Sequence, residues 1–485
     1  MNLHRMKEYL SKLVLHLSFV LLATTSLAAQ VPAQVAGDWL GALDVGPTKL
    51  RLALHVEKTG DGRLGATLNS IDQGAKIPVD TAVFESGTLR LSLKAIGASY
   101  EGTLNAEGAL EGTWSQGARK LPLVFHRQEA PFALNRPQLP KEPFPNESRE
   151  VTFQSEAGNV RLAGTLLLPA GEGPFPAVAL VTGSGPQDRD ETLMGHKPFL
   201  VIADALARRG IASLRWDDRG TGESAGDHMG STVDDFAADA RAAVAFLRSR
   251  PEVDASAIGI VGHSEGGLTA PMVTAADESV GFLVLLAPPG EPLRSLLVRQ
   301  TRALYRLQGI DEKLIDRAMA AQSEDLELIA DPSISVDRLQ EKLRALSASR
   351  RKQFTAEERA QLGVDADAIE GNIRVSTTAW FRSLTRQDPA VNLRNVKIPV
   401  LALFGEKDFQ VDAQVNAEAV RTALAAAKNP DHEVRTFPGL NHLFQHAKTG
   451  GMEEYATIEE TFAPEALGAI GDWIAARFPQ RKSPG

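Results

Sequence analysis

The chain has 485 residues, 43% of them hydrophobic, so it is long enough for more than one domain with a sizeable core. Its formal net charge is -9 and no basic block stands out, which argues against nucleic acid as a partner because phosphates require cations. Cysteine is absent, which excludes disulfides, a thiolate nucleophile and a lipid-modified cysteine.

Residues 1–28 have the pattern of an export signal. Basic residues precede the apolar stretch from Leu13 to Ala23, and Ser26-Leu27-Ala28 is a small-x-small cleavage site. An apolar core this short is atypical of a transmembrane helix, although an uncleaved anchor is the alternative. We therefore expect an exported chain, periplasmic or secreted, with no stable membrane insertion after cleavage.

Short alternating runs separated by glycine turns occupy residues 34–128. Lys49–Val56, Thr88–Leu93 and Ala98–Leu104 have the period of two that is typical of half-buried strands. This pattern predicts an antiparallel sheet closed as a small barrel or sandwich.

Three aromatic residues of this region, Trp39, Tyr100 and Trp114, have two interpretations. Exposed aromatics on small β domains bind glycans, whereas buried ones fill the core. We favour a structural or dimerising role for the domain. Prolines at 131, 137, 140, 143 and 145 then predict a stiff, extended linker over residues 129–149.

Strands and helices alternate from residue 150, which predicts a mainly parallel sheet flanked by helices, with its first part at 150–289. The predicted elements are an opening hairpin of Val151–Phe153 and Leu162–Leu168, and helices over Pro198–Arg209 and Asp234–Arg248.

The segment Gly262-His263-Ser264-Glu265-Gly266 lies between the apolar run Ile258–Val261 and a helix-compatible run. A serine at such a junction occupies a strained turn, and the two glycines let neighbouring backbone pass close to it. We therefore predict that Ser264 is a nucleophile. An ordinary tight turn is the alternative.

An insertion of about a hundred residues, assigned to 290–390, separates two strands of the predicted sheet and is far longer than an ordinary connection. Pro292–Gln308, Asp311–Ala330 and Val336–Ala348 have helical spacing, which predicts a helical lid over Ser264. A helical appendage that contributes only packing is the alternative. The candidate acyl-pocket residues are Tyr305, Trp380, Phe381 and Leu384.

Two strand-like runs of the second part of the sheet, residues 391–480, lead into Asp408 and His442. A serine hydroxyl is a poor nucleophile unless an imidazole takes its proton, and a carboxylate orients that imidazole. We assign these roles to His442 and Asp408. The alternatives are His446 as the base and Asp408 as a helix cap.

A developing oxyanion requires backbone donors. One is expected to be the N–H of Glu265, the residue after the nucleophile, and the other the N–H of Ser184, in the small-residue loop Thr182–Pro186 after an apolar strand.

These motifs resemble the α/β-hydrolase family. Gly183–Asp190, Arg215–Ser224 and Gly262–Gly267 together look like an exported bacterial esterase branch related to serine aminopeptidase-like (S33-type) sequences. The resemblance implies an α/β-hydrolase fold with a helical cap insertion, and an active-site floor organised by the Asp-x-Arg-Gly-x-Gly-x-Ser segment from Asp217. Thr182 departs from the pattern, because many relatives have histidine there.

Charged residues near these motifs also lead to expectations. Asp217 and Arg219 are expected to form a buried structural ion pair rather than a catalytic pair. The side chain of Glu265 is expected to pair with Arg189 or Arg219, while binding of a cationic substrate group is the alternative.

The motifs predict a carboxylesterase that cleaves small acyl esters, with no metal or organic cofactor because no metal-ligand spacing occurs. The alternatives are a serine aminopeptidase-like amide hydrolase, a thioesterase, and a non-catalytic glycan-binding or surface protein. The oligomeric state stays open, and a homo-oligomer is compatible with the sequence.

Overall fold

The computed structural model describes residues 34–45, 49–117, 119–132, 134–141, 146–364 and 366–480. The export signal predicted at 1–28, and Pro143 and Pro145 of the linker, lie outside these ranges. None of the helices in the described ranges is long and apolar enough to cross a membrane. The chain divides into two compact units, with the boundary between Asn135 and Arg136.

The first unit is an antiparallel β-barrel. Its strands are β1 (Gly37–Asp44), β2 (Lys49–Lys58), β3 (Leu64–Ser70), β4 (Ala75–Pro78), β5 (Thr81–Glu85), β6 (Thr88–Leu93), β7 (Ala98–Leu104), β8 (Leu110–Gln116) and β9 (Arg119–Gln128). They pair in the order β2-β1-β9-β8-β7-β6-β5-β3-β4, and an additional pairing of β2 with β3 closes the ring. Among the described strands, closure leaves the short β4 at the end of the order, and a short edge gives other chains little to pair with.

The barrel interior is filled by apolar side chains that include Trp39, Tyr100 and Trp114, each at most 3% exposed. The hydroxyl of Tyr100 donates to the carbonyl of Leu110 at 2.9 Å, and its ring meets Phe125 edge-on. These three aromatics are therefore core side chains, and they do not form an exposed platform of the kind that stacks on sugars.

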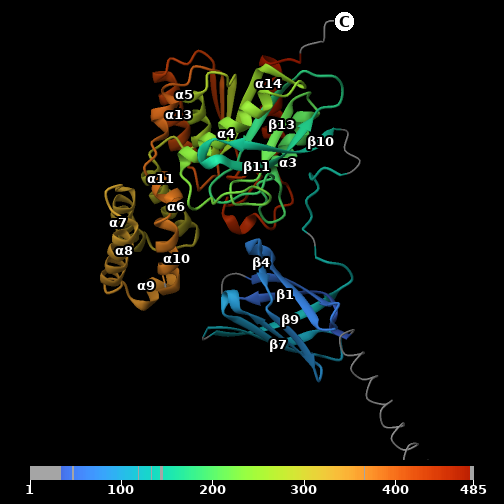
Figure 1. Cartoon of the computed structure of the whole chain (residues 1–485). Coiled ribbons are helices and arrows are strands. Elements are labelled where there is room, and N and C mark those ends of the chain that lie inside the picture. Colours follow the sequence, from blue (N-terminus) through green and yellow to red (C-terminus); the bar gives the residue numbers. More distant parts are fainter. Residues whose placement is uncertain are drawn as a thin grey trace, which may run out of the picture. The chain divides into compact units, whose positions relative to one another are not determined.

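The second unit contains an eight-stranded mixed sheet in the order β10-β11-β13-β12-β14-β15-β16-β17 (Figure 1). The strands are β10 (Glu147–Ser155), β11 (Val160–Leu168), β12 (Phe175–Val181), β13 (Ala212–Trp216), β14 (Val253–His263), β15 (Phe282–Leu286), β16 (Val400–Gly405) and β17 (His432–Phe437). The predicted opening hairpin is confirmed as the antiparallel pair β10–β11. The strands from β13 to β17 in this order are parallel to one another, so their carboxyl ends meet at one edge.

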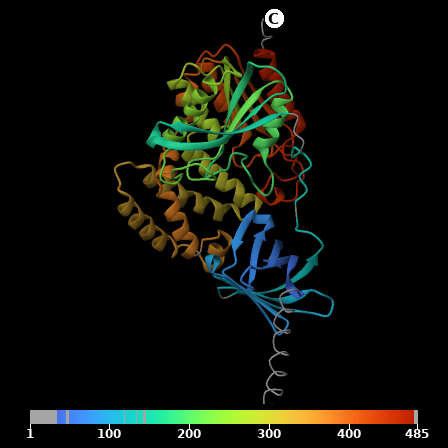
Figure 2. The same ribbon diagram turned by 45° about the vertical axis from the view of Figure 1, so that its right-hand side comes forward.

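Helices cover both faces of this sheet (Figure 2). One apolar core joins the sheet to α4 (Val233–Arg248), α5 (Glu265–Ala276) and α13 (Ala413–Ala426), and a second joins it to α3 (Pro198–Ala207) and α14 (Pro464–Arg477). The short α12 (Pro389–Leu393) adds to the first core. Strands β12 and β16 are buried along their whole length, as expected for strands covered on both faces.

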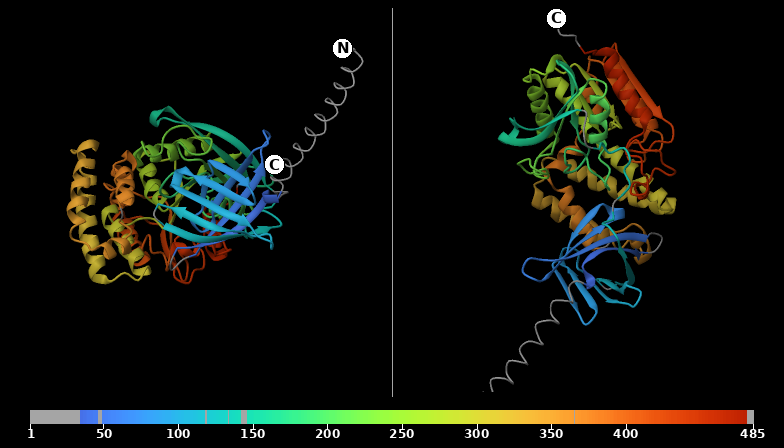
Figure 3. Two further views of the ribbon diagram at one scale, coloured as in Figure 1. Left: turned by 90° about the horizontal axis from the view of Figure 1, so that it is seen from below. Right: turned by 90° about the vertical axis from the view of Figure 1, so that its right-hand side faces the viewer.

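Of the helices between β15 and β16, the six that precede α12 gather on one side of this unit (Figure 3). They are α6 (Leu293–Leu307), α7 (Glu312–Ala330), α8 (Val336–Arg350), α9 (Ala356–Gln361), α10 (Ala366–Ser376) and α11 (Ala379–Leu384). The three helices predicted from spacing correspond to α6, α7 and α8. We call this group of six helices the cap; it has a small apolar core of its own, which includes Leu339 and Leu343 of α8.

Part of the predicted linker binds to the second unit. The guanidinium of Arg136 donates to the carbonyls of Met194 and Ile458, both at 2.8 Å, and the amide of Gln138 donates to the carbonyl of Phe462 at 2.7 Å. Side-chain hydrogen bonds therefore fix Arg136 and Gln138 in place, whereas the sequence predicted a segment kept extended by its prolines alone.

Candidate active site

Ser264 occupies the turn between β14 and α5. Its backbone has φ 52° and ψ -113°, in a region where a residue with a side chain is strained. The Ser264 N–H donates to the carbonyl of Leu286 at 2.8 Å, and its own carbonyl accepts from the N–H of Gly267 at 2.8 Å. These two hydrogen bonds keep the backbone of Ser264 in its strained conformation. Ser264 is the residue directly before α5.

The two glycines of the motif are required by close backbone contacts. A Cβ atom on Gly262 would lie 2.2 Å from the carbonyl oxygen of Gly266, and a Cβ on Gly266 would lie 2.2 Å from that of Val181. The neighbour in both cases is backbone that cannot rotate away. The predicted sharp strand-to-helix turn is confirmed, and an ordinary tight turn does not describe this geometry.

Asp408 and His442 meet at the carboxyl ends of β16 and β17. The Nδ1 of His442 lies 2.7 Å from Oδ2 of Asp408, and each residue is 5% exposed. The other carboxylate oxygen accepts from the N–H groups of Gln410 and Val411. A carboxylate at Nδ1 favours the tautomer that carries a proton on this nitrogen, which leaves Nε2 as an acceptor.

Two alternatives for these residues are not supported. The N-cap of the next helix, α13, is Asp412 rather than Asp408. The ring of His446 is exposed, with Nδ1 2.9 Å from Glu460 and Nε2 3.0 Å from Glu465, and these hydrogen bonds raise its pKa. Both of its nitrogens are engaged, so His446 is not placed to act as the base.

The loop after β12 lies against Ser264. A Cβ on Gly183 would be 3.4 Å from the Cβ of Ser264, so the loop passes within contact distance of the turn. Thr182 occupies the position where many relatives have histidine. Its hydroxyl donates to the carboxylate of Asp218 at 2.8 Å, and this hydrogen bond fixes the start of the loop. The adjacent Ser184 hydroxyl donates to the carboxylate of Glu265.

The side chain of Glu265, the residue after Ser264, is buried, and the residue is 4% exposed. It accepts hydrogen bonds from Nε1 of Trp380, at 3.1 and 3.2 Å to its two oxygens, and from Ser184. Burial raises the pKa of this carboxyl to about 7, although both hydrogen bonds favour the charged form. The expectation that Glu265 pairs with Arg189 or Arg219 is wrong, because both arginines have other carboxylates as partners.

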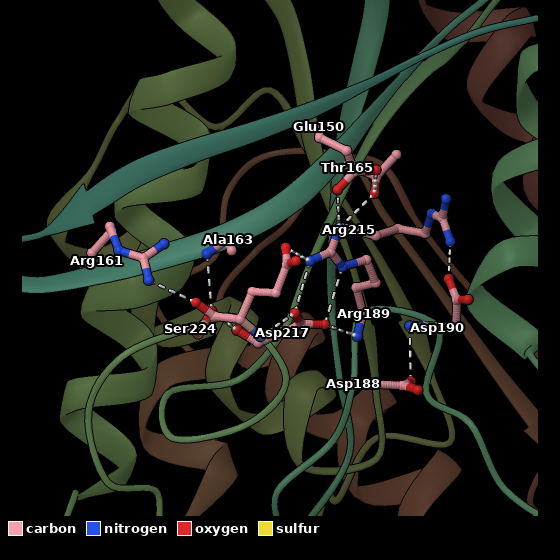
Figure 4. Close-up of polar contacts among 11 residues, drawn as sticks. Glu150, Arg161, Ala163, Thr165, Asp188, Arg189, Asp190, Arg215, Asp217 and Ser224 are labelled. Atoms are coloured by element: carbon pink, nitrogen blue, oxygen red, sulfur yellow. Dashed lines mark hydrogen bonds and ion pairs between the residues drawn. The ribbon is translucent and has the colours of Figure 1, made fainter. Parts of the chain in front are cut away.

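The expected pair of Asp217 with Arg219 is also wrong. Asp217 accepts from Nη2 of Arg189 at 2.8 Å, and this pairing lowers its pKa in spite of burial, whereas Arg219 donates to Asp239 of α4 at 2.7 Å. Figure 4 shows the guanidinium of Arg189 between Asp217 and Glu150. Both residues of this segment are thus held in ion pairs, but with partners other than the predicted ones.

Two residues near Ser264 were not identified from the sequence as functional. Glu191 and His263 are buried and hydrogen-bonded to each other at 2.8 Å. His263 directly precedes Ser264, so its position near Ser264 could be predicted from the sequence, but its partner could not. Glu191 has φ 54°, an uncommon backbone conformation for a residue with a side chain.

The four candidate acyl-pocket residues do not form one pocket. Trp380 contacts Glu265, and Leu384 belongs to the core between sheet and helices. Tyr305 and Phe381 line a largely apolar cavity of about 500 Å³ inside the cap, a size typical of small-molecule sites.

Among the residues that the structure describes, no group of three or more metal-ligating side chains is placed to hold a metal ion.

Comparison with known families identifies the fold. The sequence model of the family described as serine aminopeptidase, S33, matches residues 197–448, slightly more than half of the chain. The chain belongs to this family of α/β hydrolases. The matched range contains Ser264, Asp408 and His442 together with the cap, so the family's region coincides with the geometry described above.

Individual relatives of this hydrolase include a protein named as an esterase. Esterase EstD of Thermotoga maritima is 29% identical over 341 residues, which cover 70% of this chain and 68% of EstD. The protein PA2218 of Pseudomonas aeruginosa is 33% identical over 139 residues, 28% of this chain and 36% of its own.

Solved structures similar to this one include the Pyrococcus furiosus esterase Pf2001, at 17% identity and a TM-score of 0.42, with coverage of 71% of this chain and 98% of that one. Est1E from Butyrivibrio proteoclasticus, solved with ferulic acid, is 15% identical, with a TM-score of 0.39 and coverage of 67% and 98%.

Proposed function

We propose that this hydrolase is an exported carboxylesterase that cleaves small acyl esters through Ser264, His442 and Asp408. The main support is the strained turn that carries Ser264, together with a buried Asp408–His442 pair joined by a 2.7 Å hydrogen bond. His263, the residue before Ser264, lies 3.1 Å from the carbonyl oxygen of His442 and so links the two. A serine in such a turn, followed in the chain by an acid and a histidine, is the arrangement used for acyl transfer on this fold.

In the first half of the proposed reaction, Ser264 Oγ attacks the ester carbonyl carbon while Nε2 of His442 takes the hydroxyl proton. The carbonyl π electrons move to oxygen, and the backbone N–H groups of Ser184 and Glu265 donate to this oxyanion. The partial positive charge at the N-terminus of α5 adds to the stabilisation. The oxyanion then collapses, the bond to the alkoxide breaks, and His442 gives its proton to the departing alcohol.

In the second half, water replaces the alcohol. His442 takes a proton from the water as its oxygen attacks the acyl-enzyme, and the second oxyanion uses the same two N–H donors. Collapse releases the carboxylic acid, and the proton on His442 returns to Ser264. Asp408 stabilises the imidazolium in both halves and stays ionised throughout.

Ester cleavage is favoured over amide cleavage by the state of the nearby carboxylates. An aminopeptidase needs a carboxylate for the free amino group of its substrate. Glu265 is already bonded by Trp380 and Ser184, and Glu324 and Asp325 of the cap are both paired with Arg350. The similarity to EstD points the same way. The family's description keeps amide hydrolysis as the second candidate.

Export is supported by the signal-like pattern of residues 1–28. Outside the cytoplasm, acyl-CoA is not an expected substrate, which disfavours a thioesterase. A non-catalytic glycan-binding protein is disfavoured because the aromatics that would stack on a sugar are buried. The proposed substrate is therefore a small acyl ester, and nucleic acid is not a proposed partner.

Hydrolysis of a short-chain p-nitrophenyl ester and of an aminoacyl anilide by the wild-type protein, with Ser264→Ala as control, tests the proposal. We expect ester turnover that is lost in the variant, and little anilide cleavage. A preference for the anilide would establish the amide hydrolase instead. Absence of serine-dependent turnover, together with no labelling of Ser264 by a fluorophosphonate, would reject both.

A further inference from the structure

The steps proposed above make no use of a buried carboxylate–imidazole pair that adjoins Ser264. Oε1 of Glu191 accepts from Nδ1 of His263 at 2.8 Å and from the backbone N–H of Gly183 at 2.7 Å. Nε2 of His263 lies 3.1 Å from the carbonyl oxygen of His442. These hydrogen bonds form one continuous chain from the loop after β12 to the loop that carries the proposed base.

The partners determine the charge of His263. A carboxylate and a backbone carbonyl are both acceptors, so both ring nitrogens must donate, which only the imidazolium can do. Burial by itself lowers the pKa of His263, but the charge and hydrogen bond of Glu191 outweigh it, so that the pKa lies above its ordinary value. Asp408 adds to this effect from the other side.

Stability alone does not account for such a pair. Glu191 is 5% and His263 is 6% exposed, and taking two charges out of water costs free energy that their attraction only offsets with good geometry. A well-packed apolar pair would serve packing equally well. A charged pair does have directional hydrogen bonds, and these bonds reach three segments that meet at Ser264.

We propose that Glu191 and His263 are positioning residues for the acyl-transfer site. Glu191 fixes the peptide N–H of Gly183 and therefore the direction of the next N–H, that of Ser184. His263 is joined to Ser264 by a peptide bond and holds the backbone of His442. The pair thus sets the oxyanion donor, the nucleophile and the base relative to one another. This inference rests on the proposed function.

The charge of Glu191 has a second consequence. The rings of His263 and His442 have centroids 4.8 Å apart, and in the proposed reaction His442 becomes a cation. A lone imidazolium at this distance would oppose that step, whereas a neutral ion pair opposes it much less. Without the Glu191 charge, His263 is therefore expected to release one proton. Its ring can then no longer donate to both the side chain at position 191 and the carbonyl of His442, so the chemical step should slow even where the shape of the site is kept.

Three variants test the inference: Glu191→Gln, His263→Gln and the double variant. Glu191→Gln is isosteric and keeps an acceptor for Gly183. We expect each single variant to lower kcat for the p-nitrophenyl ester by roughly 10- to 100-fold with little change in KM, because sub-ångström misplacement of reacting groups has this effect. The double variant should be no slower than the slower single variant, because the two residues act as a unit.

The control is Glu291→Gln, which removes another buried carboxylate, one that pairs with Arg299 of the cap. It should lower the melting temperature as much as Glu191→Gln but leave kcat unchanged. Equal kcat values for Glu191→Gln and this control, with both proteins folded, would overturn the inference.

A second measurement does not depend on turnover. In wild-type protein labelled with ¹⁵N-histidine, both ring nitrogens of His263 should carry protons at pH 7, and one of them should lose its proton in Glu191→Gln. A neutral His263 ring in the wild type would overturn the inference even if the protein hydrolyses esters. Failure of Ser264 to react with a fluorophosphonate in the wild type would instead reject the proposed function.

Discussion

The indole Nε1 of Trp380 donates to both carboxylate oxygens of Glu265, at 3.1 and 3.2 Å. Trp380 belongs to α11 of the cap, and Glu265 follows Ser264 directly. The same carboxylate accepts from Ser184 of the loop after β12. One buried acid therefore connects the cap, the nucleophile turn and the proposed oxyanion loop.

Removing the indole donor should destabilise the protein in a pH-dependent manner. Trp380→Phe keeps an aromatic ring but leaves the ionised carboxylate of Glu265 without one donor, which costs roughly 1–3 kcal/mol. The cost should be full at pH 8 and smaller at pH 5, where Glu265 is protonated. Trp473→Phe is the matched control, because the buried Nε1 of Trp473 has no hydrogen-bond partner among the described residues. Chemical denaturation at both pH values measures the difference, and equal losses in the two variants would contradict it.

Glu265 itself should make stability fall as pH rises. Its pKa is about 7 in the folded protein against an ordinary value of 4.5, so between these pH values the folded state binds more protons than the unfolded state. The free energy of unfolding then decreases by about 3 kcal/mol across this window. Glu265→Gln should remove that decrease, whereas Glu278→Gln, at an exposed position, should retain it. The prediction fails if melting temperatures from pH 4.5 to 8 follow the same slope in wild type and Glu265→Gln.

The sequence was sufficient to predict that Ser264, Asp408 and His442 lie at one edge of the sheet, because each follows the end of a strand in a parallel sheet. Strand ends of that kind meet at one edge, so the position along the chain already implies proximity in space. The sharp turn at Ser264 could also be predicted locally, because the glycines on either side of it allow close backbone contacts.

Partners of buried charged residues could not be predicted in this way. Asp217 and Arg219 are two residues apart, yet their partners Arg189 and Asp239 come from a loop and from α4. The pairing depends on which side chains meet across the packed layers, and hydrophobic periodicity does not encode it.

Replacing His442 with alanine should lower kcat by roughly 10⁴- to 10⁶-fold, because the proton acceptor for Ser264 is removed. Asp408→Asn should lower kcat by about 10⁴-fold, since the amide favours the wrong tautomer of the ring. His446→Ala is the control, because both nitrogens of that exposed ring are bonded to surface carboxylates, those of Glu460 and Glu465. Steady-state hydrolysis of a p-nitrophenyl ester measures all three. A comparable loss in His446→Ala would mean that the base has been assigned incorrectly.

The cavity in the cap should set the acyl length that the site accepts. Phe381 lines this cavity and directly follows Trp380 in the chain, and Trp380 contacts Glu265, the residue after Ser264. We therefore expect the acyl chain of an ester bound at Ser264 to extend toward the cavity. Ala321→Phe places a ring in the cavity and should lower kcat/KM for octanoate esters about tenfold while leaving acetate esters unaffected, because lost apolar contact costs about 0.8 kcal/mol per methylene. Ala320→Phe, exposed on the same helix, should leave both unchanged. The effect is measured as kcat/KM for p-nitrophenyl esters with acyl chains of two to twelve carbons. An equal loss of kcat/KM for acetate and octanoate in Ala321→Phe would show that the substitution disturbs the cap rather than an acyl site.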